Sequence, residues 1–235
     1  EFDQPGYNGL GIRQLPDSML AQRIKKLDDN TPLDLRLTDE VRNIIRYYLG
    51  KNFDFIKNIK SRSEFYFPLF ESILDQYGLP LELKYIPIIE SALNPKAKSK
   101  AGATGLWQFM YATGKMQGLE ISSYVDQRMD PSLSTDAACR YFKKLYDLFG
   151  DWELAIAAYN AGPGNVTKAI RNSGGKKNFW EIRHYLPRET ANYIPSLISA
   201  IYVMNYSGTH GVVSTDQKIN YFEVDTIKAE KGIHL

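Results

Sequence analysis

Apolar residues recur at helical spacing along most of the chain, and the first clear case is the segment 38–50. Thr38 can cap this helix at its start, and Gly50 ends it. Its apolar face consists of Val41, Ile44, Ile45, Tyr48 and Leu49. Before it, residues 1–16 are rich in glycine and proline without periodicity, and they predict an extended arm.

Two shorter helices are predicted next, over 53–59 and 70–77. Gly78 and Pro80 end the second one, because proline has no amide proton to continue a helix. Together with the segment 38–50, these helices form an extension with little obvious chemistry.

The clearest helix of the chain is predicted over 134–149. Ser134 can cap it, and Gly150 ends it. Its apolar stripe consists of Ala138, Tyr141, Phe142, Leu145, Leu148 and Phe149. Asp151 can then cap a further helix over 152–160.

The last part of the chain divides into a long helix and a tail. The helix has one apolar face, formed by Tyr193, Ile194, Leu197, Ile198, Ile201, Tyr202 and Asn205. Pro195 is expected to kink this helix or to mark a fresh start. From residue 212 onward, alternating β-branched residues predict a short strand or a linker.

These elements predict a mainly α chain in three parts. Residues 1–60 form an N-terminal arm and helical extension, residues 61–208 a central helical domain, and residues 209–235 a C-terminal linker or tail.

Composition excludes several classes of protein. Lys and Arg number 29 against 27 Asp and Glu, and no long basic run occurs, so binding to nucleic acid is not indicated. No apolar run approaches the ~20 residues of a membrane helix. Cys139 is the only cysteine, so no intrachain disulfide can form, and we expect a packed thiol. The 16 Tyr, 11 Phe and 3 Trp suit a wet groove, although core packing accounts for most of them.

Glu90 is the candidate catalytic residue. It follows Ile86-Pro87-Ile88-Ile89, and burial among apolar neighbours favours the protonated form of a carboxyl group. A proton kept near neutral pH is what a general acid donates to a poor leaving group. Taken alone, an exposed helix face is the more common setting for a glutamate.

Four further features follow Glu90 in order. Ser99 lies in a loop of small and basic residues, and Gly102-Ala103-Thr104-Gly105-Leu106-Trp107-Gln108-Phe109-Met110 joins a glycine-rich turn to a helix start. Ala158-Tyr159-Asn160-Ala161-Gly162 closes a helix of small residues, and Glu189-Thr190-Ala191-Asn192-Tyr193 opens the last long helix. Each feature alone fits ordinary turn or helix-end chemistry, whereas their joint order and spacing do not.

Over about residues 65–206 these blocks resemble the goose-type lysozyme-like soluble lytic transglycosylase family, most closely its murein transglycosylase D branch. The matching elements are the Glu90-Ser91 pair, Gly105-Leu106-Trp107-Gln108, Ala158-Tyr159-Asn160, and the late Glu189 and Tyr193. The resemblance implies that residues 61–208 form a lysozyme-like helical domain.

The family's roles carry over residue by residue as what the resemblance implies. Glu90 would be the single catalytic acid and base, and Tyr193 would orient it through its hydroxyl group. Ser99, Gln108, Phe109 and Met110 would line the cleft near the scissile bond. Tyr159 and Asn160 would shape the floor of the cleft, and Glu189 would contact the glycan or its peptide.

The expected reaction is cleavage of the β-1,4 bond between N-acetylmuramic acid and N-acetylglucosamine, with formation of a 1,6-anhydro product. Ordinary glycosidases use two carboxylates. Asp126 and Asp130 lie in polar segments that favour structural roles, although the sequence leaves either open as a second carboxylate. Two alternatives remain: hydrolysis by a goose-type lysozyme activity, and a non-catalytic glycan-binding scaffold.

The resemblance implies no metal and no cofactor, and peptidoglycan glycan strands as the partner. It also implies a periplasmic or cell-envelope location, with peripheral association with the envelope or an outer-membrane lipoprotein as the precursor. The start at Glu1, without methionine, fits a processed or trimmed product. Members of the branch often carry LysM modules, and the stretch before Leu235 could be the linker to one. The oligomeric state cannot be read from the sequence.

Overall fold

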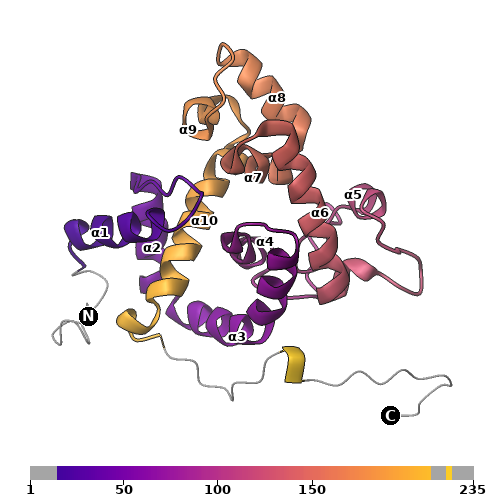
Figure 1. Cartoon of the computed structure of the whole chain (residues 1–235). Helices are drawn as coiled ribbons and strands as arrows, with labels where there is room; N and C mark the ends of the chain where they lie inside the picture. The colour runs from indigo at the N-terminus through magenta and orange to yellow at the C-terminus, as the bar shows by residue number, and fades with distance from the viewer. Residues whose placement is uncertain (1–14, 213–220, 224–235) are drawn as a thin grey trace.

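The computed structural model describes residues 15–212 and 221–223, and these residues are mainly helical (Figure 1). The α-helices are α1 (Asp17–Asp28), α2 (Asp39–Gly50), α3 (Phe53–Gln76), α4 (Ile86–Ser91), α5 (Tyr111–Met116), α6 (Pro131–Phe149), α7 (Trp152–Ala161), α8 (Pro163–Asn172), α9 (Phe179–Ile182) and α10 (Arg188–Tyr206). Short 3-10 helices are η2 (Leu81–Tyr85), η3 (Gln127–Met129), η4 (Arg183–Tyr185), η5 (Gly208–His210) and η6 (Tyr221–Glu223). Within this described part, β pairing is limited to isolated bridges, which confirms the mainly α prediction.

The N-terminal extension contains one helix more than predicted. Helix α2 begins where the sequence indicates, because the hydroxyl of Thr38 accepts a hydrogen bond from the Val41 amide at 3.3 Å. Helix α1 was not predicted: it has no side-chain cap, and it buries only Leu20 and Ile24. The predicted arm, residues 1–16, lies outside the described residues apart from Leu15 and Pro16.

The two helices predicted over 53–59 and 70–77 are wrong, because the chain forms a single helix there, α3. The helix continues through Pro68, whose missing amide costs one backbone hydrogen bond. Burial of Leu69, Phe70, Ile73 and Leu74 directly after the proline offsets that loss. The boundary drawn between residues 60 and 61 falls inside α3.

Helix α6 begins earlier than predicted, and its cap is Asp130 rather than Ser134. The Asp130 carboxylate accepts a hydrogen bond from the Leu133 amide at 2.7 Å, and Pro131 occupies the first helical position. Leu148 also departs from the predicted apolar stripe, because its side chain is 61% exposed. The end at Gly150 is confirmed, since this residue has a φ of 68°.

The start of α7 and the extent of α10 agree with the prediction from the sequence. Asp151 caps α7 through the Leu154 amide at 2.8 Å, as predicted. Helix α10 is continuous through Pro195, so this proline does not mark a fresh start. The Ala191 carbonyl, which the missing amide of Pro195 leaves without its helical partner, accepts a hydrogen bond from Nε of Arg183 at 2.7 Å.

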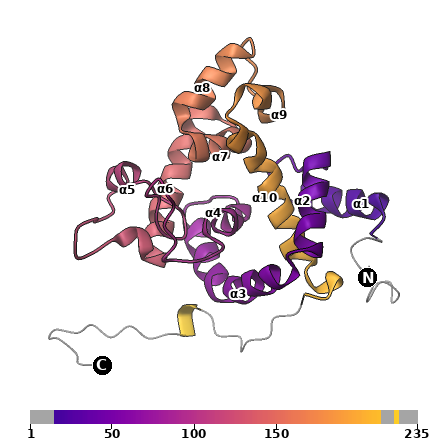
Figure 2. The same cartoon turned by 180° about the vertical axis from the view of Figure 1, so that it is seen from behind.

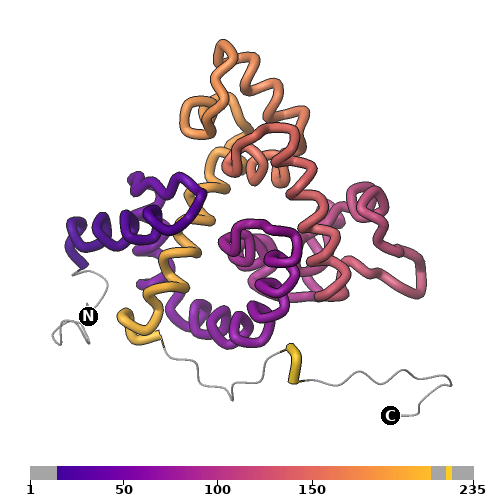
Figure 3. Tube along the Cα trace, viewed as in Figure 1, coloured from indigo at the N-terminus to yellow at the C-terminus, as the bar shows by residue number. Residues whose placement is uncertain are grey.

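The short helix α4 lies at the centre of the molecule. In opposite views, α3, α6, α7 and α10 surround it, while α1 and α2 lie outside α10 (Figures 1 and 2). The chain trace shows the same ring without the ribbons (Figure 3). Helix α10 packs against α2, α7 and α4, and it therefore connects the N-terminal extension to the centre.

The C-terminal tail is described only in part. The strand or linker predicted from residue 212 lies largely outside the described residues, and its described piece, Tyr221–Glu223, is a 3-10 helix. Among the helices that the structure describes, none has the length and apolar character to cross a bilayer.

Candidate functional site

Glu90 is held in place by the geometry of α4. Pro87 occupies the first turn, where no amide hydrogen bond is needed. The helix ends abruptly, because Ala92 and Leu93 have φ values of 53° and 57°. Non-glycine residues adopt this conformation at a cost of about 1 kcal/mol or more each. Arg62 on α3 supports the turn by donating a hydrogen bond to the Ala92 carbonyl at 2.8 Å.

The surroundings of the Glu90 carboxyl group favour its protonated form. Burial is the main cause, and the charge of Glu189 acts in the same direction, so the pKa of Glu90 is raised to about 7. A hydrogen bond donated by the Tyr193 hydroxyl to Oε1 of Glu90 opposes this rise. Glu90 is half-buried, so the carboxyl group lies among protein atoms but is not sealed from solvent.

The segment 102–110 forms a tight turn that only glycine permits at its middle. Gly105 has a φ of 87°, and a Cβ there would lie 1.8 Å from the carbonyl oxygen of Arg128. Gln108 has a φ of 49°, and its side-chain amide nitrogen donates to the Gly105 carbonyl at 2.8 Å and to the Ala97 carbonyl at 3.3 Å. The Gln108 side chain therefore ties this turn to the preceding loop.

Arg128 holds the two ends of the same turn together, and the sequence analysis missed it. Its guanidinium donates to the carbonyls of Gly102 and Phe109, each at 3.1 Å. It also pairs with Asp126 at 2.7 Å, and this hydrogen bonding lowers the pKa of the Asp126 carboxyl. Nothing in Gln127-Arg128-Met129 signals the role, because the bonded carbonyls are 26 and 19 positions away.

Tyr159 lies close enough to Glu90 for the charge of Glu90 to act on it. Its hydroxyl donates to the Trp107 carbonyl at 2.7 Å, and its ring stacks on Phe142 with centroids 4.4 Å apart. Burial raises the pKa of Tyr159 well above its usual value, and the charge of Glu90 adds to that rise. Tyr159 thus joins α7 to the Gly105–Gln108 turn beside the carboxyl group.

Asn160 is connected to the start of α10 through Thr190, a second residue that the sequence analysis did not single out. The Thr190 hydroxyl donates to Oδ1 of Asn160 at 2.8 Å, and Thr190 is buried. Glu189 precedes it and is exposed, although its charge reaches Glu90. The structure therefore brings Asn160, Glu189 and Tyr193 into one neighbourhood with Glu90.

The residues expected to line a cleft differ in how far their side chains are exposed to solvent. Phe109 is 2% exposed and packs edge-on against Tyr159 at 6.1 Å, so its side chain belongs to the core. Met110 is 45% exposed and offers apolar surface. Ser99 is exposed, and its hydroxyl accepts a hydrogen bond from the Ala103 amide at 3.0 Å, which supports its own loop.

Ser91 does more than support its own helix. Its hydroxyl lies 3.0 Å from the Pro87 carbonyl and 2.9 Å from the Leu106 carbonyl. A hydroxyl has one proton, so it donates to one of these oxygens at a time. Either way, Ser91 brings α4 against the Gly105–Gln108 turn.

The other acids considered in the sequence have structural contacts. Asp126 pairs with Arg128, and Asp130 caps α6. Throughout residues 15–212 and 221–223, no three His, Cys, Asp or Glu side chains gather as they would around a metal ion. What the site offers chemically is a carboxyl group that can both donate and accept a proton near pH 7, beside an oriented tyrosine.

Comparison with known proteins gives a family match and several similar chains. Residues 68–182 match the family described as Transglycosylase SLT domain. The chain is 34% identical over 190 residues to the membrane-bound lytic murein transglycosylase D of Escherichia coli K12, covering 79% of this chain and 41% of that protein. It is 35% identical over 116 residues to the soluble lytic murein transglycosylase of the same strain, covering 47% of this chain and 18% of that protein.

A solved structure shows the same fold. The crystal structure of the 70 kDa soluble lytic transglycosylase from Escherichia coli aligns with a TM-score of 0.54 at 26% identity. The alignment covers 87% of this chain and 33% of that chain. This similarity confirms the predicted fold class, while the chain spans less than half the length of these relatives.

Proposed function

The chain carries a transglycosylase SLT domain over residues 68–182, and from this premise we propose that it is a lytic transglycosylase that cleaves the glycan strands of peptidoglycan. The observation that carries the proposal is the state of Glu90. A half-buried carboxyl group with a pKa of about 7 is present in both its protonated and its charged form near neutral pH. One such group can serve as acid in one step and as base in the next.

The proposed reaction uses Glu90 twice. Glu90 first protonates the glycosidic oxygen between N-acetylmuramic acid and N-acetylglucosamine. The carbonyl oxygen of the muramyl 2-acetamido group attacks its own anomeric carbon, and the glycosidic bond breaks. The Glu90 carboxylate then removes the proton of the C6 hydroxyl, which attacks the anomeric carbon and closes the 1,6-anhydro ring. This attack breaks the bond between the acetamido oxygen and the anomeric carbon and so restores the acetamido group, while Glu90 regains its proton and no water is consumed.

The neighbouring residues take supporting roles in this proposal. Tyr193 holds the Glu90 carboxyl group through its hydroxyl, and Tyr159 and Asn160 shape the floor beside it. Ser99, Gln108, Phe109 and Met110 belong to the segment that lines the scissile bond, Phe109 by supporting Tyr159 from the core. Glu189 contacts the glycan or its peptide from its exposed position on α10.

Two contacts favour a reaction with a single carboxylate. Retaining and inverting glycosidases use a second carboxylate close to the first. Asp126 forms an ion pair with Arg128, and Asp130 caps α6 by accepting a hydrogen bond from the Leu133 amide. Both acids are therefore engaged in structural contacts, and in this proposal the substrate's own acetamido group is the nucleophile.

The experiment compares Glu90→Gln with Glu153→Gln on purified peptidoglycan sacculi. Both glutamates are held in environments that raise their pKa to about 7, but Glu153 on α7 accepts a hydrogen bond from the Asp34 amide away from the site. Loss of a general acid lowers the rate by about 10²–10⁴-fold, so Glu90→Gln is expected to release almost no muropeptides. Glu153→Gln is expected to keep the wild-type rate, and wild-type activity of Glu90→Gln would refute the role.

Mass spectrometry of the released muropeptides separates the proposed lyase from a lysozyme-type hydrolase. The anhydro product is lighter than the hydrolysis product by one water. A catalytically silent wild-type protein that still binds sacculi would instead indicate the glycan-binding scaffold. Because the proposed substrate, peptidoglycan, lies in the cell envelope, we propose that the protein acts there.

A further inference from the structure

The segment that follows Glu90 carries lysines but no acidic residue. The whole chain has a net charge of only +2, yet residues 91–119 contain four lysines and no Asp or Glu. Three of the four, Lys96, Lys98 and Lys100, lie in a short loop, residues 94–104, which we call the lysine loop. All three are exposed.

Backbone and side-chain hydrogen bonds give the lysine loop a defined shape. The Ser99 amide donates to the Ala103 carbonyl at 2.9 Å, and the Gly102 amide donates to the Ser99 carbonyl at 3.0 Å. At the base of the loop, the Ala97 carbonyl accepts from the Gly105 amide at 2.9 Å and from the Gln108 side chain at 3.3 Å. The lysines are thus carried by a loop that is tied to the turn beside Glu90.

Asp126, the acid on which the charge of Lys98 acts, is already paired with Arg128. Hydrogen bonds from Arg128 lower the pKa of the Asp126 carboxyl, and the charge of Lys98 adds a smaller contribution. Asp126 and Arg128 lie 2.7 Å apart, so their charges compensate each other. Within the described ranges, no ion pair involves Lys96, Lys98 or Lys100, which leaves the loop a basic surface.

We propose that the lysine loop binds the carboxylates of the peptides attached to the glycan strand, so that the enzyme prefers peptide-bearing over naked glycan. This inference rests on the proposed function. Each muramic acid unit carries its peptide on the lactyl group, close to the bond that Glu90 would cleave. Those peptides bear free carboxylates, and three exposed ammonium groups on a loop that is bonded to the Gly105–Gln108 turn complement that charge.

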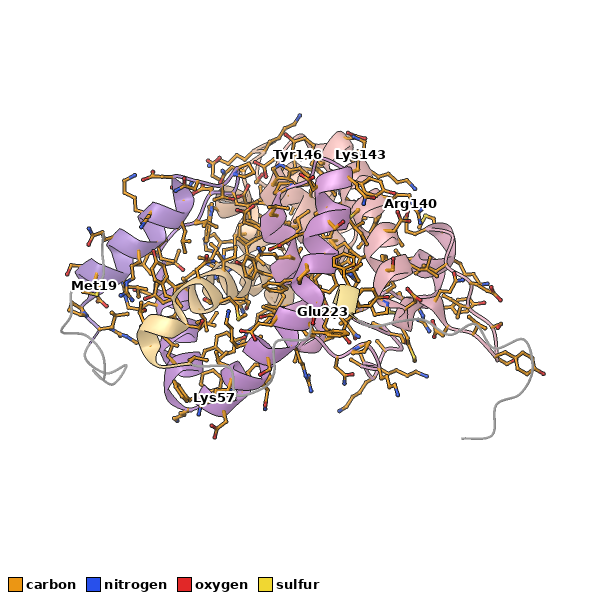
Figure 4. The ribbon with its side chains drawn as sticks, turned by 60° about the horizontal axis from the view of Figure 1, so that its bottom comes forward. Met19, Lys57, Arg140, Lys143, Tyr146 and Glu223 are labelled. Atoms are coloured by element: carbon orange, nitrogen blue, oxygen red, sulfur yellow. The ribbon has the colours of Figure 1, made fainter. Side chains whose placement is uncertain are left out.

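The experiment measures KM and kcat on solubilised glycan strands with their peptides and on the same strands after amidase treatment removes the peptides. The test variant is the triple substitution Lys96→Gln, Lys98→Gln and Lys100→Gln. The matched control removes three exposed lysines on other elements: Lys51→Gln, Lys143→Gln and Lys168→Gln. Lys143 lies at the outer edge of the molecule in Figure 4.

The test variant is expected to raise KM for peptide-bearing strands about five- to tenfold at low salt, because exposed charge pairs are individually weak. The increase should shrink as salt screens the charges, and KM for naked strands should not change. The control triple variant should behave as wild type on both substrates. Replacing the three lysines with arginine, which keeps the charge, should restore the wild-type KM.

Failure of this inference can be distinguished from failure of the proposed function. If the wild-type protein cleaves neither substrate, the proposed function itself fails. If it cleaves both and the test variant matches it on both, the lysine loop does not recognise peptides while the function stands. Reduced binding to vesicles of anionic phospholipid, with unchanged kinetics, would overturn the inference in favour of a membrane surface.

Discussion

The hydroxyl group of Tyr193 donates a hydrogen bond to Oε1 of Glu90, across 103 positions of the sequence. This bond connects α10 to α4 at the carboxyl group itself. It stabilises the charged form of Glu90, whereas burial and the charge of Glu189 stabilise the neutral form. The pKa of about 7 is the balance of these opposing influences, which makes it sensitive to a single atom.

Tyr193→Phe removes that atom, and we expect the pKa of Glu90 to rise. A hydrogen bond to a charged group contributes about 1.5 kcal/mol or more, which corresponds to about one pH unit. The basic limb of the pH profile of kcat/KM should therefore move toward higher pH by that amount. Tyr185→Phe, which alters an exposed tyrosine before α10, serves as the control. An unmoved basic limb would show that Tyr193 does not act on the acid.

Glu153→Gln is expected to make the stability of the protein less dependent on pH. Burial raises the pKa of Glu153 to about 7 from an ordinary value of 4.5, and Glu153 is 6% exposed. Between these values the folded state holds a proton that the unfolded state has lost, so the free energy of unfolding falls as pH rises, by about 3 kcal/mol. Glutamine keeps an acceptor for the Asp34 amide without the charge.

Urea unfolding of the Glu153→Gln variant and of the wild type at pH 5 and pH 8 measures this difference. The variant should be the more stable of the two at pH 8, with a smaller drop between the two pH values. Glu90 contributes in the same direction, so part of the pH dependence remains in the variant. Parallel losses in both proteins would contradict the expected role of Glu153.

Comparing Gly105→Ala with Gly102→Ala separates two costs of adding a methyl group: collision with neighbouring backbone and strain from a positive φ. Both glycines have a φ of 87°, but only at Gly105 would a Cβ collide with backbone, 1.8 Å from the Arg128 carbonyl oxygen. We expect Gly102→Ala to cost about 1–2 kcal/mol through its φ alone. Gly105→Ala should cost about 4 kcal/mol or prevent folding. The melting temperatures of the two variants measure this difference. Equal melting temperatures would mean that the turn opens to accept the methyl group at Gly105.

Cys139 is expected to be unreactive in the folded protein. The residue is fully buried on α6, and burial raises the pKa of its thiol to about 12. Since the thiolate is the reactive form, a disulfide reagent at pH 8 should label the native protein only as it unfolds. Labelling should become complete within minutes in 6 M urea, roughly at the rate of a free thiol. Rapid labelling without denaturant would show that α6 separates locally from its neighbours.

Local signals in the sequence predicted many element boundaries correctly. Thr38, Gly150 and Asp151 act within a few residues, so their roles can be read directly. The cap of α6 was missed although Asp130-Pro131 is also a local signal, because Ser134 stood closer to the apolar stripe. The two helices predicted over 53–59 and 70–77 are one helix, because burial keeps the chain helical through Pro68, and burial is not a local property.

The candidate site divides in the same way. Glu90, Tyr159 and Tyr193 were found through ordered blocks of sequence, and the structure brings them together. Arg128 was not found, because it acts through long-range hydrogen bonds from an unremarkable stretch. Thr190 lies inside the block that opens α10, but its hydrogen bond to Asn160 spans 30 positions and cannot be read from the spacing. Phe109 was expected to line the cleft because it belongs to one of those ordered blocks of sequence, but its side chain is buried in the core.

The packing of α10 against both α2 and α4 bears on which fragments of the chain we expect to fold. Val41, Ile45 and Leu49 are buried, and the Ser199 hydroxyl on α10 lies 3.3 Å from the Val41 carbonyl. A fragment that started at residue 61 would cut α3 and leave the outer face of α10 in water. Since α10 carries Tyr193, we expect a minimal active fragment to include α2 and the whole of α3.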